Sequence, residues 1–299
     1  MSFLGRLGKP WFLYRPQQLF LRAVRNTARS PDLRVLKLPA GFALEADVGK
    51  TIGRSLWQTG VHDLAASEGV CRLMQPGALA VDAGANIGYM TALMALRAGP
   101  QGRVLAFEPH PALVHLLQAN LARLGTLAGA VETHAVALSD RSGEAELLEP
   151  AGFEQNEGLA SLSPQGNSAE SKSLRVKTVR LDEALGQRHV TLLKLDVEGH
   201  EEAVLRGAAA AIKERRITHI LFEEHSGPDS AVCRLLQAAG YTIFQIGWRL
   251  RGPVLAGVHE PALATAYAAP SYLGTLEPAE AQRRLAPRGW GVLGCRVNL

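Results

Sequence analysis

The sequence predicts an α/β protein with a doubly wound sheet, and two strand–helix segments carry that prediction. In the first, a short apolar stretch (77–81) begins after a Pro-Gly break, and a stretch with helical spacing of apolar residues (89–98) follows a glycine-containing turn. In the second, the apolar stretch 102–107 precedes a stretch with leucines at helical spacing (112–124). Alternation of this kind is typical of parallel sheets whose two faces are covered by helices.

The turn after the first strand has residue types that bind a small charged ligand. A glycine turn at a helix N-terminus offers N–H groups to a carboxylate or phosphate and lets the ligand approach closely. The glycine spacing is G-x-x-x-G, whereas dinucleotide sites have G-x-G-x-x-G. An acid two residues before the first glycine favours a ligand with an ammonium and a carboxylate, such as S-adenosylmethionine (SAM). The cofactor-binding candidates here are Asp82, Gly84, Asn86, Gly88 and Thr91, and a purely structural turn is the alternative.

A second acid, Glu108, follows the next predicted strand. Nucleotide-binding α/β folds place a carboxylate about 20 residues after the glycine turn, where it binds the ribose diol. The two oxygens of a carboxylate suit a vicinal diol because each accepts one O–H hydrogen bond. We therefore expect Glu108 to bind ribose, and not only to cap the helix that begins near Pro111.

A third acid, Asp196, follows the apolar stretch 190–195, which is predicted to be a central buried strand. Because open parallel sheets bind ligands at the carboxyl ends of their strands, Asp82, Glu108 and Asp196 are expected to line one crevice. Asp196 is expected to contact the cofactor near its methyl end, where a carboxylate would orient or deprotonate a substrate hydroxyl. Lys194 points to the same side of the strand as Asp196, so we expect it to pair with an acid.

Four further residues near the strand ends are candidates for the reaction. Glu198 and His200 come shortly after the central strand, and Glu224 and His225 follow another predicted strand (218–222). We expect Glu198 and His225 to take part in catalysis, since a histidine titrates near neutral pH. His200 and Glu224 are expected to contact the substrate. No compact ligand motif such as H-E-x-x-H is present, so a metal site is not predicted.

Several motifs occur in an order that resembles the FkbM-type SAM-dependent methyltransferases. They lie within residues 51–225 and are VDAGANIGYMT, AFEPHP, VALSD, LDEAL and LLKLDVEGHEEAVLRGA. The resemblance implies a class I methyltransferase (Rossmann-like) fold, with a doubly wound, mostly parallel seven-stranded sheet. It implies O-methylation of a hydroxyl on a sugar, polyketide or other small metabolite. It also implies that the end of a third predicted strand (131–138), at Leu138, Ser139 and Asp140, holds the adenine of SAM, with Ser139 or Asp140 as the polar side chain. An aspartate that only forms the turn is an equal alternative for Asp140.

Two other functions are compatible with this type of sheet. An NAD-dependent oxidoreductase would carry the dinucleotide fingerprint, which the glycine turn lacks. A nucleotide-binding module that has lost its chemistry would not need Asp82, Glu108 and Asp196 together. We therefore prefer the methyltransferase interpretation.

The composition is that of an ordinary globular protein. The chain has 299 residues, of which 47% are apolar and 20% charged. It contains no apolar run long enough to cross a membrane, and its start lacks a secretory pattern. The cysteines Cys71, Cys233 and Cys295 are odd in number and far apart, which argues against a disulfide framework. These features predict a cytoplasmic protein.

The N-terminal region differs from the rest in charge. Residues 1–37 contain eight basic residues and one acidic residue. Residues 11–25 mix apolar and basic side chains as an amphipathic helix would. This fits a lid or dimer helix on the main domain or, alternatively, contact with a membrane surface or a lipid-linked sugar. No nucleic-acid-binding motif accompanies the charge. With a hairpin expected at 33–46, we divide the chain into an extension (1–50) and a SAM-dependent methyltransferase domain (51–299).

The remaining segments have weaker patterns. Residues 151–173, rich in Gly, Ser, Asn, Gln and Glu, are expected to form a surface loop long enough to cover a site. A helix is expected at 230–240, with strands at 241–246 and 291–297. The stretch 247–288 between these strands is interpreted either as a contact in a homo-oligomer or as part of the substrate wall.

Overall fold

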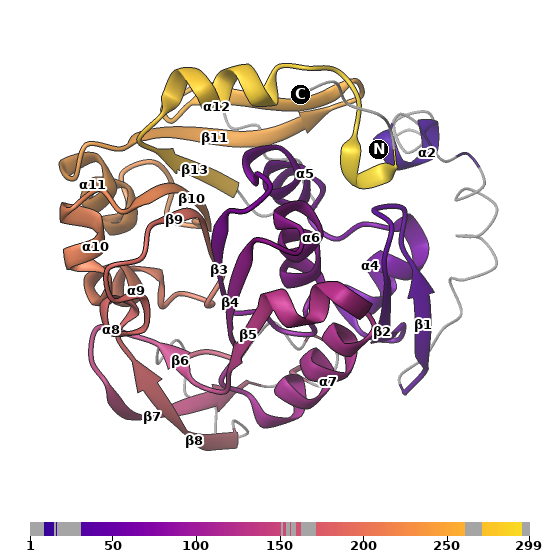
Figure 1. Cartoon of the computed structure of the whole chain (residues 1–299), viewed down its shortest axis with the longest axis horizontal. Coiled ribbons are helices and arrows are strands. Elements are labelled where there is room, and N and C mark those ends of the chain that lie inside the picture. The colour runs from indigo at the N-terminus through magenta and orange to yellow at the C-terminus, as the bar shows by residue number, and fades with distance from the viewer. Residues whose placement is uncertain are drawn as a thin grey trace.

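The computed structural model describes residues 9–14, 16, 31–150, 152–153, 156, 160–162, 172–260 and 271–294. A central mixed sheet lies between two layers of helices (Figure 1). Its strands are, in chain order, β3 (Leu79–Ala83), β4 (Arg103–Phe107), β5 (Val131–His134), β9 (Val190–Leu195), β10 (Ile217–Glu223), β11 (Thr242–Arg249), β12 (Gly252–Gly257) and β13 (Ser271–Thr275). In space they follow the order β12-β11-β13-β10-β9-β3-β4-β5.

The topology is that of a doubly wound sheet. The neighbouring strands from β10 to β5 are parallel, whereas β13, β11 and β12 extend the sheet by antiparallel pairs. The first of these strands in the chain, β3, lies between β4 and β9, so the winding reverses between β3 and β9. Doubly wound sheets bind ligands at this point. The predicted fold class is confirmed, with the difference that the sheet has eight strands among the described residues where seven were expected.

The C-terminal part of the sheet differs from the prediction. The expected strand at 291–297 is wrong in its described part, because Gly291–Leu293 forms a short 3-10 helix, η3. The strand between β10 and β11 is instead β13, and all five of its residues are buried. The apolar residues Trp290, Val292 and Leu293 join the core on one face of the sheet. These residues are therefore apolar because they are buried in this core, and not because they form a strand.

Helices cover both faces of the sheet. The helices of the described residues are α2 (Pro10–Leu13), α4 (Thr51–Thr59), α5 (Leu64–Leu73), α6 (Tyr89–Ala98), α7 (Pro111–Ala122), α8 (Leu181–Leu185), α9 (Glu201–Gly207), α10 (Ala209–Lys213), α11 (Ala231–Ala238) and α12 (Pro278–Leu285), with a 3-10 helix, η1 (Gly125–Ala130). α5, α6 and α12 contribute to one core, and α8 to α11 contribute to the other. Figure 1 shows α8 to α11 on one side of the central strands and α5 and α6 on the other.

The expected strand at 131–138 is two strands that belong to different sheets. β5 ends at His134, and β6 (Ala137–Leu138) pairs with β8 (Lys172–Val179). β7 (Gly143–Glu149) completes this three-stranded sheet by antiparallel pairing with β8. The change of sheet brings Leu138 to the cavity described below.

The predicted N-terminal hairpin is present as β1 (Leu33–Lys37) and β2 (Ala43–Asp47). It is tied to α7 by Asn120, whose side chain exchanges two hydrogen bonds with the backbone of Glu45 (2.7 and 2.9 Å). Of the predicted helix at 11–25, the structure describes α2, Tyr14 and residue 16, and the rest lies outside the described residues. No helix within the described ranges is both long and apolar enough to cross a membrane.

Candidate active site

A cavity of about 710 Å³ lies at the carboxyl ends of β3, β4, β9 and β10. Small-molecule sites typically have volumes of roughly 300–1,000 Å³. The predicted site residues that line it are Gly84, Asn86, Glu108, Leu138, Asp196, Glu198 and His200. Those that lie outside its lining are Asp82, Gly88, Thr91, Ser139, Asp140, Glu224 and His225.

The turn between β3 and α6 requires glycine at position 84. The φ angle of Gly84 is 77°, in the left-handed region that favours glycine. A Cβ atom there would lie 1.9 Å from the backbone oxygen of Asp196. The turn therefore passes directly against the end of β9. Asn86 also has a positive φ, 49°, which asparagine tolerates better than most residues.

The N–H groups of this turn are engaged within the protein. Gly84 and Ala85 both donate to the carbonyl oxygen of Phe107 at 3.0 Å. Asn86 donates to Glu108 at 2.9 Å, and Ile87 donates to the side-chain oxygen of Asn86 at 2.8 Å. The expectation that these groups bind a ligand carboxylate therefore finds no support. The first turn of α6, which also faces the cavity, has the N–H groups that a helix leaves unpaired.

Asp82 lies behind the cavity and does not face it. Its side chain is fully buried and accepts a hydrogen bond from the hydroxyl of Thr91 at 2.6 Å. Lys194 Nζ lies 3.4 Å from Asp82, 3.2 Å from Asp196 and 3.0 Å from the carbonyl oxygen of Gly84. The predicted pairing of Lys194 with an acid is thus confirmed. Direct contact of Asp82 and Thr91 with the cofactor is not supported, because both lie one layer below the cavity.

Glu108 lines the cavity from the end of β4. Its two oxygens accept hydrogen bonds from the backbone N–H groups of Asn86 and His110, each at 2.9 Å. Burial raises the pKa of Glu108, and these two hydrogen bonds lower it. Each carboxylate oxygen has a second lone pair, so Glu108 retains acceptor capacity for a ligand.

Only one of the three predicted adenine-binding residues lies at the cavity. Leu138 lines the cavity, but Ser139 and Asp140 do not. The hydroxyl of Ser139 instead forms a hydrogen bond with the Nε2 atom of His200 at 2.9 Å. His200 does line the cavity, and burial lowers its pKa. Ser139 therefore orients His200 from behind.

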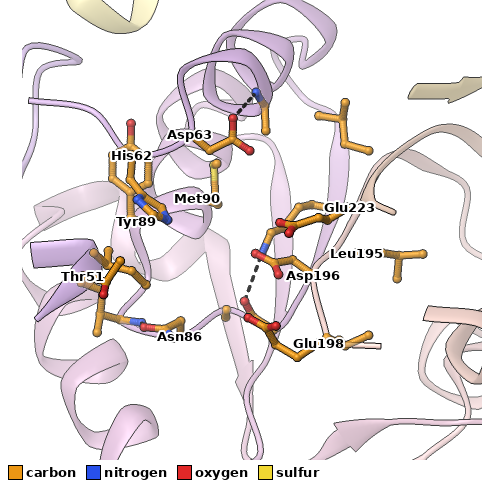
Figure 2. A pocket seen from close by; sticks show the side chains of 18 of the residues that line it. Thr51, His62, Asp63, Asn86, Tyr89, Met90, Leu195, Asp196, Glu198 and Glu223 are labelled. Carbon is orange, nitrogen blue, oxygen red and sulfur yellow. Dashed lines mark hydrogen bonds and ion pairs between the residues drawn. The ribbon is translucent and has the colours of Figure 1, made fainter. Parts of the chain in front are cut away.

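Three carboxylates line the side of the cavity near β9 and β10 (Figure 2). Asp196 and Glu223 follow residues that are paired across the two strands, which brings them next to each other. Burial, followed by the charge of Asp196, raises the pKa of Glu223 to about 7 and that of Glu198 to about 8. Sequence reasoning missed Glu223 and predicted its neighbour Glu224, because it placed the strand end one residue too early.

Glu224 and His225 do not have the predicted positions. Glu224 is turned away from the cavity and accepts a hydrogen bond from the backbone N–H of Ser226 at 2.6 Å. The side chain of His225 is 71% exposed, and its Nε2 atom lies 2.7 Å from Glu223. His225 therefore reaches the site only through Glu223.

The region before β3 supplies site residues that the sequence did not identify. Thr51 and Ser55 of α4 line the cavity, as do His62 and Asp63 in the loop before α5. Asp63 caps α5 through a hydrogen bond from the N–H of Ala66 (3.1 Å). In the sequence, the feature that could have pointed to this region is an aspartate, Asp63, in the capping position before an apolar helix.

Two segments that the sequence indicates as candidate covers of the site, 151–173 and the N-terminal segment, reach the cavity with residues that the structure describes. In the stretch 151–173, the hydroxyl of Ser161 donates to the carbonyl oxygen of Glu198 at 2.6 Å, and Leu162 lines the cavity. In the N-terminal segment, Trp11 lines the cavity and its ring centroid lies 5.6 Å from that of Trp248. This part of the segment therefore packs on the residues around the cavity.

The sheet and the cavity define a doubly wound α/β protein whose candidate site lies at the winding reversal, where such sheets bind ligands. A family model described as the methyltransferase FkbM domain matches residues 82–243. The chain belongs to the FkbM methyltransferase family, as the sequence motifs had indicated.

Several known proteins are similar to this chain. The hexuronic acid methyltransferase AglP of Haloferax volcanii is 31% identical over 72% of this chain and 89% of AglP. The AMB antimetabolite synthetase AmbE of Pseudomonas aeruginosa is 29% identical over 93% of this chain, which spans only 14% of AmbE. A crystal structure of a methyltransferase FkbM from Methylobacillus flagellatus has 15% identity and a TM-score of 0.44, over 89% of this chain and 60% of that one.

Proposed function

We propose that the protein transfers a methyl group from SAM to a hydroxyl oxygen of a small molecule, with sugars as the first acceptor class. The observation that carries this proposal is the position of Glu108 and Asp196. They follow β4 and β9, the two strands that flank β3, and both line one cavity beside the Gly84 turn. This arrangement would place an acid able to bind the ribose close to an acid able to bind the acceptor.

One part of the cavity fits the cofactor. Glu108 has a free lone pair on each oxygen for the ribose diol. Phe107 and Leu138 provide apolar surface for a base, while Asn86 and the start of α6 at Tyr89 provide polar groups for the methionine portion. When bound, SAM supplies a positively charged sulfonium with an electrophilic methyl group.

The acceptor part is polar and acidic. In this proposal Asp196 orients the acceptor hydroxyl, and Lys194 holds the Asp196 carboxylate in place from a distance of 3.2 Å. Glu198 and His200 extend the same wall. The similarity to AglP supports a sugar acceptor. Polyketides and lipid-linked sugars are the next classes to test.

The alternative enzyme, an NAD-dependent oxidoreductase, has less support. The G-x-x-x-G spacing of Gly84 and Gly88 and the family membership both argue against it. A binding module without activity shares the cofactor site and differs only in turnover.

Calorimetry followed by an activity assay tests the proposal. We expect SAM and S-adenosylhomocysteine to bind and NAD not to bind. Mass spectrometry of sugars incubated with the protein and SAM is expected to show the addition of one methyl group to D-glucuronate or a related glycoside. Binding of NAD in place of SAM would support the oxidoreductase. Binding of SAM without transfer to any hydroxyl compound would indicate the inactive module.

A further inference from the structure

His62 lines the cavity from the loop between α4 and α5, and Figure 2 shows it across the cavity from Asp196 and Glu223. Building on the proposed O-methylation, we propose that the imidazole of His62 removes the proton from the acceptor hydroxyl. Histidine is the side chain that most often acts as a general base. The sequence motifs at the strand ends do not include His62, and its position in the cavity is what identifies it.

The backbone of His62 is held in place by its neighbours. The hydroxyl of the buried Ser67 donates a hydrogen bond to the His62 carbonyl oxygen at 2.6 Å. The next residue, Asp63, has a φ of 41°, which is unusual for a residue other than glycine. Its carboxylate accepts hydrogen bonds from the N–H of Ala66 (3.1 Å) and the hydroxyl of Ser271 (3.2 Å). Strained backbone held in this way is frequent at functional sites, where it fixes the direction of side chains.

The ring of His62 is available for proton transfer. Within the described part of the chain, its nitrogens have no hydrogen-bond partner. Burial lowers the pKa of His62, the carboxylates of Asp63 and Asp196 raise it, and Lys194 lowers it. The net lowering leaves the ring uncharged at neutral pH, with one nitrogen able to accept a proton.

The carboxylates across the cavity are less suited to this task. Asp196 is paired with Lys194 at 3.2 Å, and the ammonium group makes the carboxylate a weaker proton acceptor. Glu223 is paired with His225 at 2.7 Å. The pKa of Glu198 is raised to about 8, so it holds a proton at neutral pH and cannot accept another. These groups bind and orient the acceptor, and the uncharged imidazole remains as the base.

The proton and charge balance of the step is complete. The acceptor oxygen forms its bond to the methyl carbon as its O–H bond breaks, and the electron pair of the cleaved carbon–sulfur bond stays on sulfur. The proton passes to the free nitrogen of His62, so the positive charge lost at sulfur appears on the imidazolium. Asp63 and Asp196 stabilise that charge until the proton leaves to solvent.

The first test compares His62→Gln with His189→Gln, which changes an exposed histidine between α8 and β9. D-Glucuronate and methyl glucosides serve as acceptor probes. We expect kcat of His62→Gln to fall about 10²–10⁴-fold, with the Kd for SAM unchanged to within about twofold and the acidic limb of the pH–rate profile lost. His189→Gln should match the wild type. Wild-type kcat in His62→Gln overturns the inference, whereas failure of the wild type to bind SAM overturns the proposed function instead.

The second test needs no acceptor. The His62 ring is titrated by ¹H–¹³C NMR in the complex with S-adenosylhomocysteine, with His62→Gln used to assign the signal. We expect an uncharged ring at neutral pH, and a midpoint that moves to lower pH in Asp63→Asn, because a carboxylate that favours the imidazolium is removed. A ring that is protonated at neutral pH, or a midpoint that does not respond to Asp63→Asn, overturns the inference whatever the turnover.

Discussion

The carboxylate of Glu108 accepts a hydrogen bond from the backbone N–H of Asn86 at 2.9 Å, across 22 positions of the chain. This bond connects the end of β4 to the turn after β3. Glu108, the acid proposed to bind ribose, is therefore fixed to the turn beside it. A substitution of Glu108 is expected to move Asn86, and a shift of Asn86 is expected to move Glu108.

Replacement of Glu108 by alanine is expected to weaken SAM binding by about 1–3 kcal/mol, because a charged hydrogen-bond acceptor is lost. Calorimetry of the purified variant measures the change. Glu144→Ala, which alters an exposed acid on β7, is the matched control and should bind SAM as the wild type does. Wild-type affinity in Glu108→Ala would reduce Glu108 to a residue that caps backbone N–H groups.

Replacement of Asp196 by asparagine is expected to reduce methyl transfer far more than SAM affinity. The amide keeps the size of the side chain but loses the charge that faces the acceptor and pairs with Lys194 at 3.2 Å. The measurement is kcat with an accepted sugar together with the Kd for SAM. An equal loss of both quantities would mean that Asp196 holds the cofactor rather than the acceptor.

The sequence predicted which strand ends form the crevice, because strand polarity and glycine spacing are local properties. It predicted Glu108 and Asp196 correctly, but it placed Asp82 in the cavity and chose Glu224 instead of Glu223. Asp82 and Lys194 are paired across β3 and β9, and that register buries Asp82 under the turn. His62 precedes the sheet, and no periodicity links it to residues more than a hundred positions away. β13 was missed for a related reason, since its pairing with β10 and β11 is determined by the whole fold.

The acidic wall should make stability depend on pH. The pKa values of Glu198 and Glu223 rise from 4.5 to about 8 and about 7 through burial and the charge of Asp196. At a pH between the ordinary pKa and the raised pKa of each group, the carboxyl is protonated in the folded protein and ionised in the unfolded chain. The free energy of unfolding contributed by these groups therefore falls as the pH rises from about 4.5 to about 8.

Urea unfolding at several pH values within this window measures the effect. Glu223→Gln, which cannot ionise, is expected to show a smaller fall in stability with pH than the wild type. Glu144→Gln on the surface of β7 should keep the wild-type slope. If the slope of Glu223→Gln equals that of the wild type, Glu223 ionises as freely in the folded protein as in the unfolded chain.

The contact between the Gly84 turn and β9 can be tested with a matched pair of glycines. Gly84 and Gly77 have nearly the same φ, 77° and 79°, so alanine at either position pays a similar backbone cost of roughly 1–2 kcal/mol. Only at Gly84 would the new Cβ meet backbone, at 1.9 Å from the Asp196 oxygen, while Gly77 has open space. We expect Gly84→Ala to be clearly less stable in urea than Gly77→Ala, and to lose SAM binding. Equal stability would mean that β9 moves aside without cost.

The C-terminal segment is anchored by a buried ion pair on α5. Arg72 and Glu68 lie 2.6 Å apart, and their side chains are 1% and 0% exposed. Arg72 also donates to the carbonyl oxygens of Pro287 and Gly289 (2.7 and 2.8 Å), while Glu68 accepts from the backbone of η3 at 3.0 Å. Both charges are thus satisfied by partners more than 200 positions away.

Because an unpaired buried charge is costly, Glu68→Gln should destabilise the protein by about 3–5 kcal/mol. Glu202→Gln removes the partner of Arg206 in an exposed i,i+4 pair, so it should change stability little. Urea unfolding measures both, and hydrogen exchange of residues 287–294 distinguishes local release from global unfolding. A small loss in Glu68→Gln with full protection of 287–294 would mean that apolar packing of Trp290, Val292 and Leu293 alone holds the segment against α5.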